Sequence, residues 1–488
     1  MSRPLPVLAI ILLVAVATRV VTFGNPTVIL DDQFYLLVGD AMRDGAWPYV
    51  DIWDRKPFGL FLLFQGIAEL GDGSIVAMQI VATLFAAATA FVIQRIARLF
   101  VADEPALLAA LAYLIMLPLL GGQSAQSPLF YNLLVALAGW LLLSSAARPG
   151  APLHRNALLA MLLCGLAMAI KPVALVEGAA FGLGFLWLLF RRDASLAKLA
   201  GTAAAMVAVA LVPVLLPFAV YAGAGDEARD AYVYANFISI FQKEGLGASA
   251  KLAGLAFFLL FSLPLLVLAG VGLRSRLAKQ GADVATRLLM LWLGAAVLGY
   301  LAVPHFFDHY ALPMLVPLSV AAAFAFALPS GRLYAAALLL FCLLQGAITD
   351  LAGNRAARAE FDAVSERIDE ARRGGCLYLA DGPPWLYRST DACTVTPYLF
   401  PDHLNLVVER NAVGVDPARE LQRILAMRPA VVVTQDSEQA KHGPDTQRIL
   451  LPALAREYRT IYRVPGDGPP MLATLRVWQR RDLAPPAP

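Results

Sequence analysis

The chain has 488 residues, of which 59% are hydrophobic and only 15% are charged, and its formal net charge is +3. Soluble globular proteins have about 25% charged residues, so this composition excludes an ordinary soluble protein and indicates a membrane protein. The nearly balanced charges give no sign of a nucleic-acid partner.

Apolar runs recur along the first 350 residues, and each is close to the roughly 20 residues that cross a hydrocarbon core as a helix. Eleven runs are predicted to be transmembrane helices: 5–21, 75–93, 106–120, 129–143, 158–170, 173–190, 200–222, 252–273, 288–303, 311–328 and 333–348. Lys and Arg are more frequent in the loops on the side of the N-terminus, which favours a cytoplasmic N-terminus. The first run is interpreted as an anchor, because no convincing signal-peptide cleavage site follows it.

The acidic stretch that follows the first run is the most unusual part of the sequence. It contains six aspartates and ends in two cations and a proline: Asp31, Asp32, Asp40, Asp44, Asp51, Asp54, Arg55, Lys56 and Pro57. Residues 33–44 have a partly helical apolar pattern, and FGLFLLFQGIAEL after the proline is too short for a comfortable span, so two interfacial helices are predicted in this first exterior loop. Solvated helix caps would explain one acid, but two acids followed by an Arg-Lys pair favour a functional site.

Other polar segments fall in connections on the same predicted side of the membrane. They are GGQSAQS at 121–127, Lys171-Pro172, residues 223–251, and PHFFDHY at 304–310. Their common side predicts a site at the exterior membrane surface. Glu177 lies inside a predicted span, where an acid needs a partner, and the sequence does not identify that partner.

The composition changes after residue 350, and an odd number of spans places this part outside. A helical pattern ends at Gly374, and short apolar strands, CLYLA, AVVVT and TLRVW, then alternate with helical stretches. The prediction is a transmembrane domain at 1–350 and a soluble exterior α/β domain at 351–488. Cys376 and Cys393 each open a predicted apolar strand of this domain and could form a disulfide in an oxidising compartment, which the sequence leaves open.

The acidic loop resembles the first exterior loop of integral membrane glycosyltransferases that use polyprenyl-phosphate sugars. The resemblance is carried by Asp31-Asp32, Tyr35, Gly45-Ala46-Trp47-Pro48-Tyr49, Asp51 and Lys56-Pro57, and it extends over roughly 1–330 through GQSAQS, Lys171-Pro172 and the segment from His305 to Pro313. This superfamily includes the protein mannosyltransferases, the aminoarabinose transferases acting on lipid A and the Rgt-type galacturonosyltransferases. It implies a multi-pass helical fold and transfer of a sugar from a lipid phosphate.

The resemblance also implies roles for particular residues. Asp31 matches the catalytic base and Lys56 a lysine that contacts the lipid phosphate, while Asp32 would orient the base or the acceptor. A departing phosphate also needs further cations. The candidates for this role are Arg55, Lys171, His305 and His309. The other site candidates are Tyr35, Tyr49, Asp51, Gln123 and Tyr310. Relatives often have a second acid where this chain has Gln126-Ser127-Pro128, and its absence weakens the case for a metal or a two-carboxylate mechanism.

The predicted activity is inverting transfer of one sugar from a polyprenyl-phosphate donor to a hydroxyl of an envelope acceptor: lipid A or core, another glycan, or protein. The expected location is a bacterial inner membrane with the C-terminal domain in the periplasm. No cofactor is firmly implied, and no metal is predicted, since His305 and His309 with Asp308 lack a further zinc ligand nearby. A flippase or transporter and a glycan polymerase or ligase are the alternatives, and the oligomeric state is open.

Overall fold

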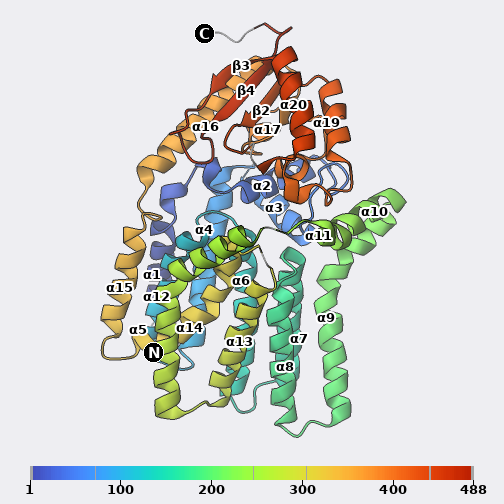
Figure 1. Ribbon diagram of the computed structural model, residues 1–488. Helices are drawn as coiled ribbons and strands as arrows, with labels where there is room; N and C mark the ends of the chain where they lie inside the picture. The colour runs from blue at the N-terminus through green and yellow to red at the C-terminus, as the bar shows by residue number, and fades with distance from the viewer. Residues whose placement is uncertain (1–3, 72, 246, 304, 439–440, 485–488) are drawn as a thin grey trace. The chain divides into compact units, whose positions relative to one another are not determined.

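The structure is a computed structural model, and it describes residues 4–71, 73–245, 247–303, 305–438 and 441–484 (Figure 1). Contacts within the chain divide it into two compact units. The helical unit comprises Met1–Val21, Gln79–Pro217 and Leu246–Asp350. The mixed unit comprises Thr22–Met78, Phe218–Gly245 and Leu351–Pro488, so the acidic loop belongs to the same unit as the C-terminal residues.

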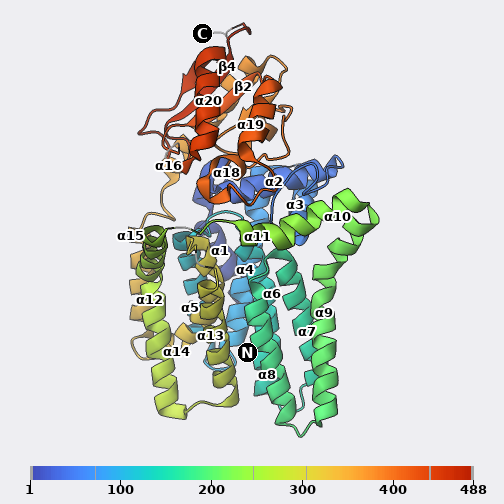
Figure 2. The same cartoon turned by 45° about the vertical axis from the view of Figure 1, so that its right-hand side comes forward.

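Among the described residues, eleven α-helices lie wholly or mainly in the helical unit. They are α1 (Pro4–Ala17), α4 (Ile75–Ala97), α5 (Asp103–Met116), α6 (Ser127–Ala147), α7 (Leu153–Ile170), α8 (Ala174–Phe190), α9 (Leu196–Gly223), α12 (Ala248–Gln280), α13 (Val284–Leu301), α14 (Leu315–Phe326) and α15 (Gly331–Leu344). Helices α6, α7, α8 and α13 pack on one another, as do α5, α12, α14 and α15 (Figure 2). Small residues allow this close packing: a Cβ atom on Gly272 of α12 would lie 2.7 Å from the Ala321 carbonyl oxygen of α14.

The lengths of these helices confirm the multi-pass fold. Within the described ranges, nine helical segments are long and apolar enough to cross a membrane, and they match nine of the eleven predicted spans. The other two predicted spans, 173–190 and 333–348, match the shorter apolar helices α8 and α15. The short helix expected after Pro57 is α3 (Phe58–Gly71).

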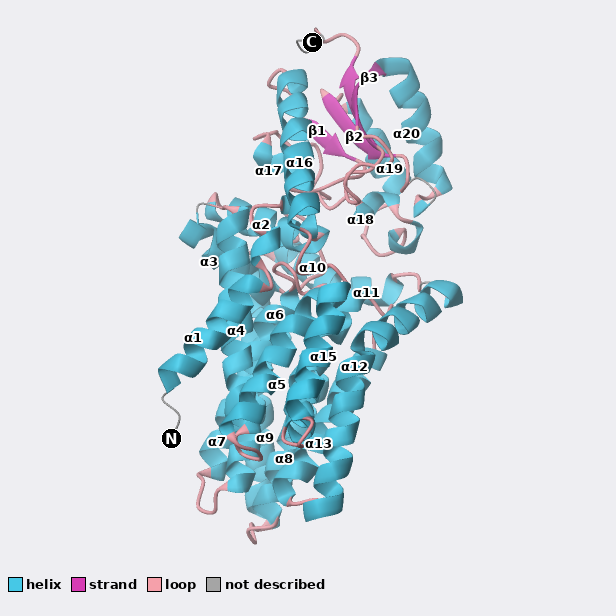
Figure 3. Ribbon diagram, turned by 90° about the vertical axis from the view of Figure 1, so that its left-hand side faces the viewer, coloured by secondary structure: helices cyan, strands magenta, loops and turns pink. Residues whose placement is uncertain are grey.

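The mixed unit contains the two helices of the acidic loop and a small sheet. Its elements are α2 (Leu30–Arg43), α3, α10 (Asp226–Val233), a π-helical turn (Tyr234–Ile238), α11 (Ser239–Gln242), α16 (Leu351–Arg372), β1 (Leu377–Leu379), α17 (Leu386–Ser389), α18 (Asp402–Asn405), the 3₁₀ turn Val407–Glu409, α19 (Pro417–Ala426), β2 (Val431–Gln435), α20 (Pro444–Glu457), β3 (Tyr458–Arg463) and β4 (Leu475–Arg480). Figure 3 shows α16 on one face of the sheet and α19 and α20 on the other.

The strand order of the sheet is β1-β2-β4-β3, with β1 and β2 parallel and the other two pairs antiparallel. The apolar segments CLYLA, AVVVT and TLRVW form β1, β2 and β4, as predicted. Strand β3 was not predicted, because YRTIYR at the sheet edge carries arginines instead of an apolar run. The disulfide between Cys376 and Cys393 is formed, which answers the question that the sequence left open.

The acidic loop is anchored in the core of the mixed unit by Trp53. Its indole packs in a cluster with residues of the sheet and its helices, including Tyr378, Leu421 and Val432. The Trp53 backbone N–H donates to the Pro397 carbonyl at 2.9 Å. The neighbouring side chains of Asp54, Arg55 and Lys56 therefore start from a fixed backbone.

Helix α2 is equally constrained by its contact with α3. A Cβ atom on Gly39 would lie 2.5 Å from the Phe64 backbone carbon, so only glycine permits this approach. Phe34 and Tyr35, in the middle of α2, are buried. The first turn of α2 contains Asp31 and Asp32.

Candidate functional site

Asp31 and Asp32 are adjacent on α2 but have different surroundings. Consecutive side chains on a helix point about 100° apart. The side chain of Asp31 is 25% exposed, whereas Asp32 is buried. Asp31 is therefore the member of the pair that a substrate can reach.

Lys56 brings several predicted site residues together. Its ammonium nitrogen lies 3.7 Å from Oδ1 of Asp31 and 4.0 Å from Oδ2 of Asp54. It also lies 5.3 Å from the centre of the Tyr35 ring, and the Lys56 carbonyl accepts a 2.8 Å hydrogen bond from the Tyr49 hydroxyl. The result is a carboxylate, a cation and two tyrosines in one unit, with the Lys56 side chain 27% exposed.

The Tyr35 side chain is buried beside Lys56. Tyr35 is fully buried, and Lys56 is the nearest cation to its hydroxyl group. Because Tyr35 follows Asp31 by four positions on α2, both side chains lie on the same helical face. The Tyr35 hydroxyl and the Asp31 carboxylate therefore lie on the same side of α2 as Lys56.

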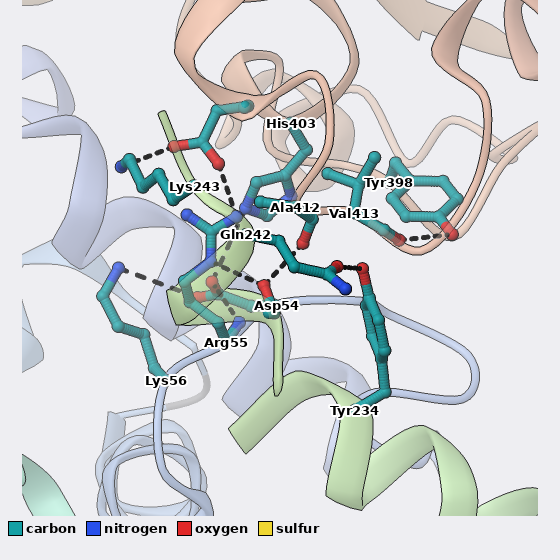
Figure 4. A network of polar contacts seen from close by, with 12 residues as sticks. Asp54, Arg55, Lys56, Tyr234, Gln242, Lys243, Tyr398, His403, Ala412 and Val413 are labelled. Atoms are coloured by element: carbon teal, nitrogen blue, oxygen red, sulfur yellow. Dashed lines mark hydrogen bonds and ion pairs between the residues drawn. The ribbon is translucent and has the colours of Figure 1, made fainter. Parts of the chain in front are cut away.

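Asp54 is held by a network that the sequence did not predict (Figure 4). Its Oδ1 lies 3.5 Å from Nε2 of His403 and accepts a 2.6 Å bond from the Arg55 backbone N–H. Burial opposes the ionisation of Asp54, but the charge of Lys56 and the contacts with His403 and Arg55 outweigh it and lower the pKa of Asp54 to about 2. Asp54 is therefore an anion that helps to position Lys56.

The Arg55 guanidinium forms an ion pair with a second buried carboxylate (Figure 4). This carboxylate belongs to Glu409, whose other oxygen lies 2.6 Å from the Lys243 ammonium. The Arg55 Nε also donates to the Ser239 hydroxyl at 3.2 Å. Burial raises the pKa of Glu409, yet Arg55 and Lys243 lower it overall, to about 2. Glu409 thus joins all three chain segments of the mixed unit.

Asp51, another candidate, lies in the turn before Trp53. It is exposed, and its Oδ2 accepts a 2.7 Å bond from the Trp47 backbone N–H. That bond gives it a turn-forming role.

Other candidates meet in the helical unit. The Lys171 ammonium lies 4.5 Å from the centre of the Tyr310 ring, and His309 packs edge-on against the same ring at 4.6 Å. Nδ1 of His309 lies 3.3 Å from Oδ1 of Asp308. His305 stacks on Phe307, with ring centres 6.0 Å apart. Lys171, Tyr310 and His309 thus form a second cluster of predicted residues.

The loop that contains Gln123 is fixed by a buried arginine that sequence reasoning missed. Arg19 donates to the carbonyls of Gly122 and Ser124, on either side of Gln123, and to the Thr83 hydroxyl at 3.1 Å. These contacts lie in the helical unit. The signal in the sequence was an arginine at the end of the first apolar run.

Glu177 has the partner that the sequence could not identify. Its Oε1 accepts a 2.7 Å hydrogen bond from the Trp292 indole N–H. Both residues are buried, on α8 and α13. This pairing explains how the acid is tolerated within the helical unit.

In the parts of the chain that the structure describes, no group of three or more His, Cys, Asp or Glu side chains is arranged to hold a metal ion. No ligand set is therefore assigned to a metal.

Acid should weaken the mixed unit through Asp54 and Glu409. Their pKa values in the folded chain are about 2, below the ordinary 3.8 and 4.5, so their stabilisation is complete above pH 5 and is lost as the pH falls towards 2. Each is worth about 2 to 3 kcal/mol, and they do not add fully because they share Arg55. Protease resistance of residues 400–413 should fall below pH 5 when it is measured from pH 7 to pH 3 in the Asp402→Asn variant, which removes a neighbouring carboxyl whose raised pKa has the opposite effect, and a profile flat to pH 3 would contradict this.

Two solved membrane-protein structures have a similar fold, which confirms the predicted multi-pass helical fold. The crystal structure of ArnT from Cupriavidus metallidurans bound to undecaprenyl phosphate is similar with a TM-score of 0.66, at 15% identity over 99% of both chains. The oligosaccharyltransferase AglB from Archaeoglobus fulgidus, in complex with an inhibitory peptide and a dolichol-phosphate, has a TM-score of 0.57 and 13% identity, covering 99% of this chain and 75% of AglB.

No protein-family model and no curated protein sequence matches the chain. The relationship is therefore visible in the fold and not in overall sequence identity.

Proposed function

We propose that the protein is a membrane glycosyltransferase that transfers a sugar from a polyprenyl phosphate. The observation that carries the proposal is the 3.7 Å approach of Lys56 to Asp31, both partly exposed. The fold supports it, because ArnT was crystallised with undecaprenyl phosphate and AglB was determined with a dolichol-phosphate.

In the proposed reaction, an acceptor hydroxyl attacks C1 of the donor sugar from the side opposite the phosphate. Asp31 takes the hydroxyl proton, the new C1–O bond forms, and the bond between C1 and the phosphate oxygen breaks. The polyprenyl phosphate leaves with one more negative charge than it had in the donor, and the Lys56 ammonium stabilises that charge. Direct displacement inverts the configuration at C1.

The proposal gives different roles to Lys56 and Arg55. Arg55 is neutralised by Glu409 and its side chain is only 11% exposed, against 27% for Lys56. In this proposal, Lys56 is therefore the cation of the mixed unit that binds the phosphate, and Arg55 positions Lys56. Asp32 would support Asp31 from within α2, and Tyr49 would hold the Lys56 backbone.

Lys171, His305 and His309 stay candidates for the phosphate, and Tyr310 and Gln123 stay candidates for the proposed site. The support for Lys171 is its cation–π contact with Tyr310, which holds the ammonium in a defined place. The proposed acceptor is a hydroxyl of the cell envelope on the exterior face of a bacterial inner membrane: lipid A or core, another glycan, or protein. The Cys376–Cys393 disulfide supports that side, because disulfides persist in oxidising compartments.

The cation is tested by Lys56→Met and Lys56→Arg in protein reconstituted in nanodiscs. The assay supplies a panel of undecaprenyl-phosphate sugars and envelope lipid extract, and measures sugar transfer. Lys56→Met should lose about 100-fold in turnover, because a preorganised charge partner is removed, whereas Lys56→Arg should keep part of the activity. Lys56→Met at near wild-type turnover, or donor lipid that crosses the bilayer without being consumed, would contradict the proposal.

A further inference from the structure

Asp402, the first residue of α18, lies in the segment that packs against the Asp31 end of α2. The Phe34 ring of α2 lies 5.2 Å from the ring of Phe400 and 6.1 Å, edge-on, from that of His403. Phe34 follows Asp31 by three positions, so the two share a helical face. The residues on either side of Asp402 are therefore packed beside the face of α2 that carries Asp31.

Asp402 differs from the other acids of this network. Asp54 and Glu409 both have cationic partners, as described above. The carboxyl of Asp402 has no ion pair or hydrogen bond to any residue that the structure describes, and it is only partly exposed. The charged groups that face it are Glu409 of the 3₁₀ turn, Asp31 of α2, Asp381 after β1 and Lys243 after α11.

A carboxyl in this position affects which sugar can bind. Sugar hydroxyls can donate hydrogen bonds to Asp31 and Asp402, and the Tyr35 hydroxyl offers a third polar contact on the same face of α2. A sugar with its own carboxylate would instead meet two acids, and juxtaposed like charges are a strong means of discrimination.

We propose that Asp402 is a specificity-determining residue, which favours a sugar without a carboxylate beside Asp31 and disfavours a uronic acid. The inference rests on the proposed function, since it assumes that the sugar of a lipid-phosphate donor binds at Asp31.

The titration of Asp402 gives the inference a second readout. Burial, and then the charges of Glu409 and Asp31, raise the pKa of Asp402 to about 7. Asp402 is thus mostly neutral at pH 6 and mostly charged at pH 8. Discrimination against a uronic acid should therefore increase with pH across this interval.

The test compares two donors that differ only at C6, undecaprenyl-phosphate glucose and undecaprenyl-phosphate glucuronic acid. Both are phosphodiesters that stay ionised between pH 6 and pH 8. Affinities are measured in nanodiscs of zwitterionic lipid, with undecaprenyl phosphate as the reference ligand without a sugar. The variant is Asp402→Asn, and the matched control is Glu366→Gln, an exposed acid on α16.

Wild type and Glu366→Gln should prefer the glucose donor roughly tenfold at pH 8, and less at pH 6. Asp402→Asn should lower the ratio to about the wild-type value at pH 6 or below it and make it independent of pH, with its affinity for undecaprenyl phosphate retained, which also shows that the variant is folded. An unchanged ratio in Asp402→Asn, or no preference in wild type at pH 8, would overturn the inference. Failure of wild type to bind undecaprenyl phosphate at all would overturn the proposed function, and this inference with it.

Discussion

Asp31→Asn should reduce sugar transfer from an undecaprenyl-phosphate donor by about 100 to 10,000-fold, the usual contribution of a general base. The asparagine has nearly the same size as aspartate but cannot accept the acceptor's proton at neutral pH. Because Lys56 is unchanged, the variant should still bind undecaprenyl phosphate. With purified protein in nanodiscs, we therefore expect a large loss of turnover and little change in the affinity for undecaprenyl phosphate.

Asp44→Asn is the matched control for this experiment. It makes the same chemical change in the same loop, at an exposed residue that ends α2, and it should keep wild-type turnover. If Asp31→Asn retained most of the activity, Asp31 would not be the base. If it lost undecaprenyl phosphate binding as well, the residue would serve binding rather than proton transfer.

Glu409→Gln should destabilise the mixed unit by about 3 to 5 kcal/mol, the typical cost of removing one partner from a buried ion pair. The substitution leaves two cations, Arg55 and Lys243, without their shared carboxylate. The segments that carry them should then open more often. Hydrogen–deuterium exchange should become faster in residues 400–413 and around Arg55, and the thermal unfolding midpoint should fall.

Glu370→Gln provides the comparison for that effect. Glu370 pairs with Arg367 at 3.2 Å on the surface of α16, with both side chains substantially exposed. Exposed pairs of this kind contribute about 0 to 1 kcal/mol, so its unfolding midpoint should stay near that of wild type. Equal effects of the two substitutions would show that the Glu409 network does not hold the acidic loop.

Much of the fold could be predicted because membrane spans are a local property of the sequence. Each apolar run specifies its own helix, since no water is present in the bilayer to satisfy the backbone. Hydropathy detects apolar character better than it detects the ends of a helix. The shorter apolar helices α8 and α15 are therefore also predicted to be spans. Strand β3 was missed because an edge strand is defined by its neighbours, and its arginines hid it.

The site was predictable only where its residues are close in sequence. Asp31 and Lys56 lie in one loop, and the resemblance connected them. Glu409, His403 and Asp402 are more than 340 residues away from that loop and form no motif of their own, so only the tertiary structure brings them to it. Arg55 shows the consequence: the sequence predicts a phosphate contact, and the structure pairs it with Glu409.

The expectation that Lys171 and His309 share one site with Asp31 stays a prediction. These residues cluster with Tyr310 in the helical unit, whereas Asp31 belongs to the mixed unit.

The most direct test of the central claim is a cryo-electron microscopy map of the protein in nanodiscs with bound undecaprenyl phosphate. The phosphate is expected within about 3 Å of the Lys56 ammonium, a hydrogen-bond distance, with the Asp31 carboxylate facing the position where the sugar would be attached. A phosphate bound away from Lys56, with Asp31 facing no space that a sugar could occupy, would contradict the account.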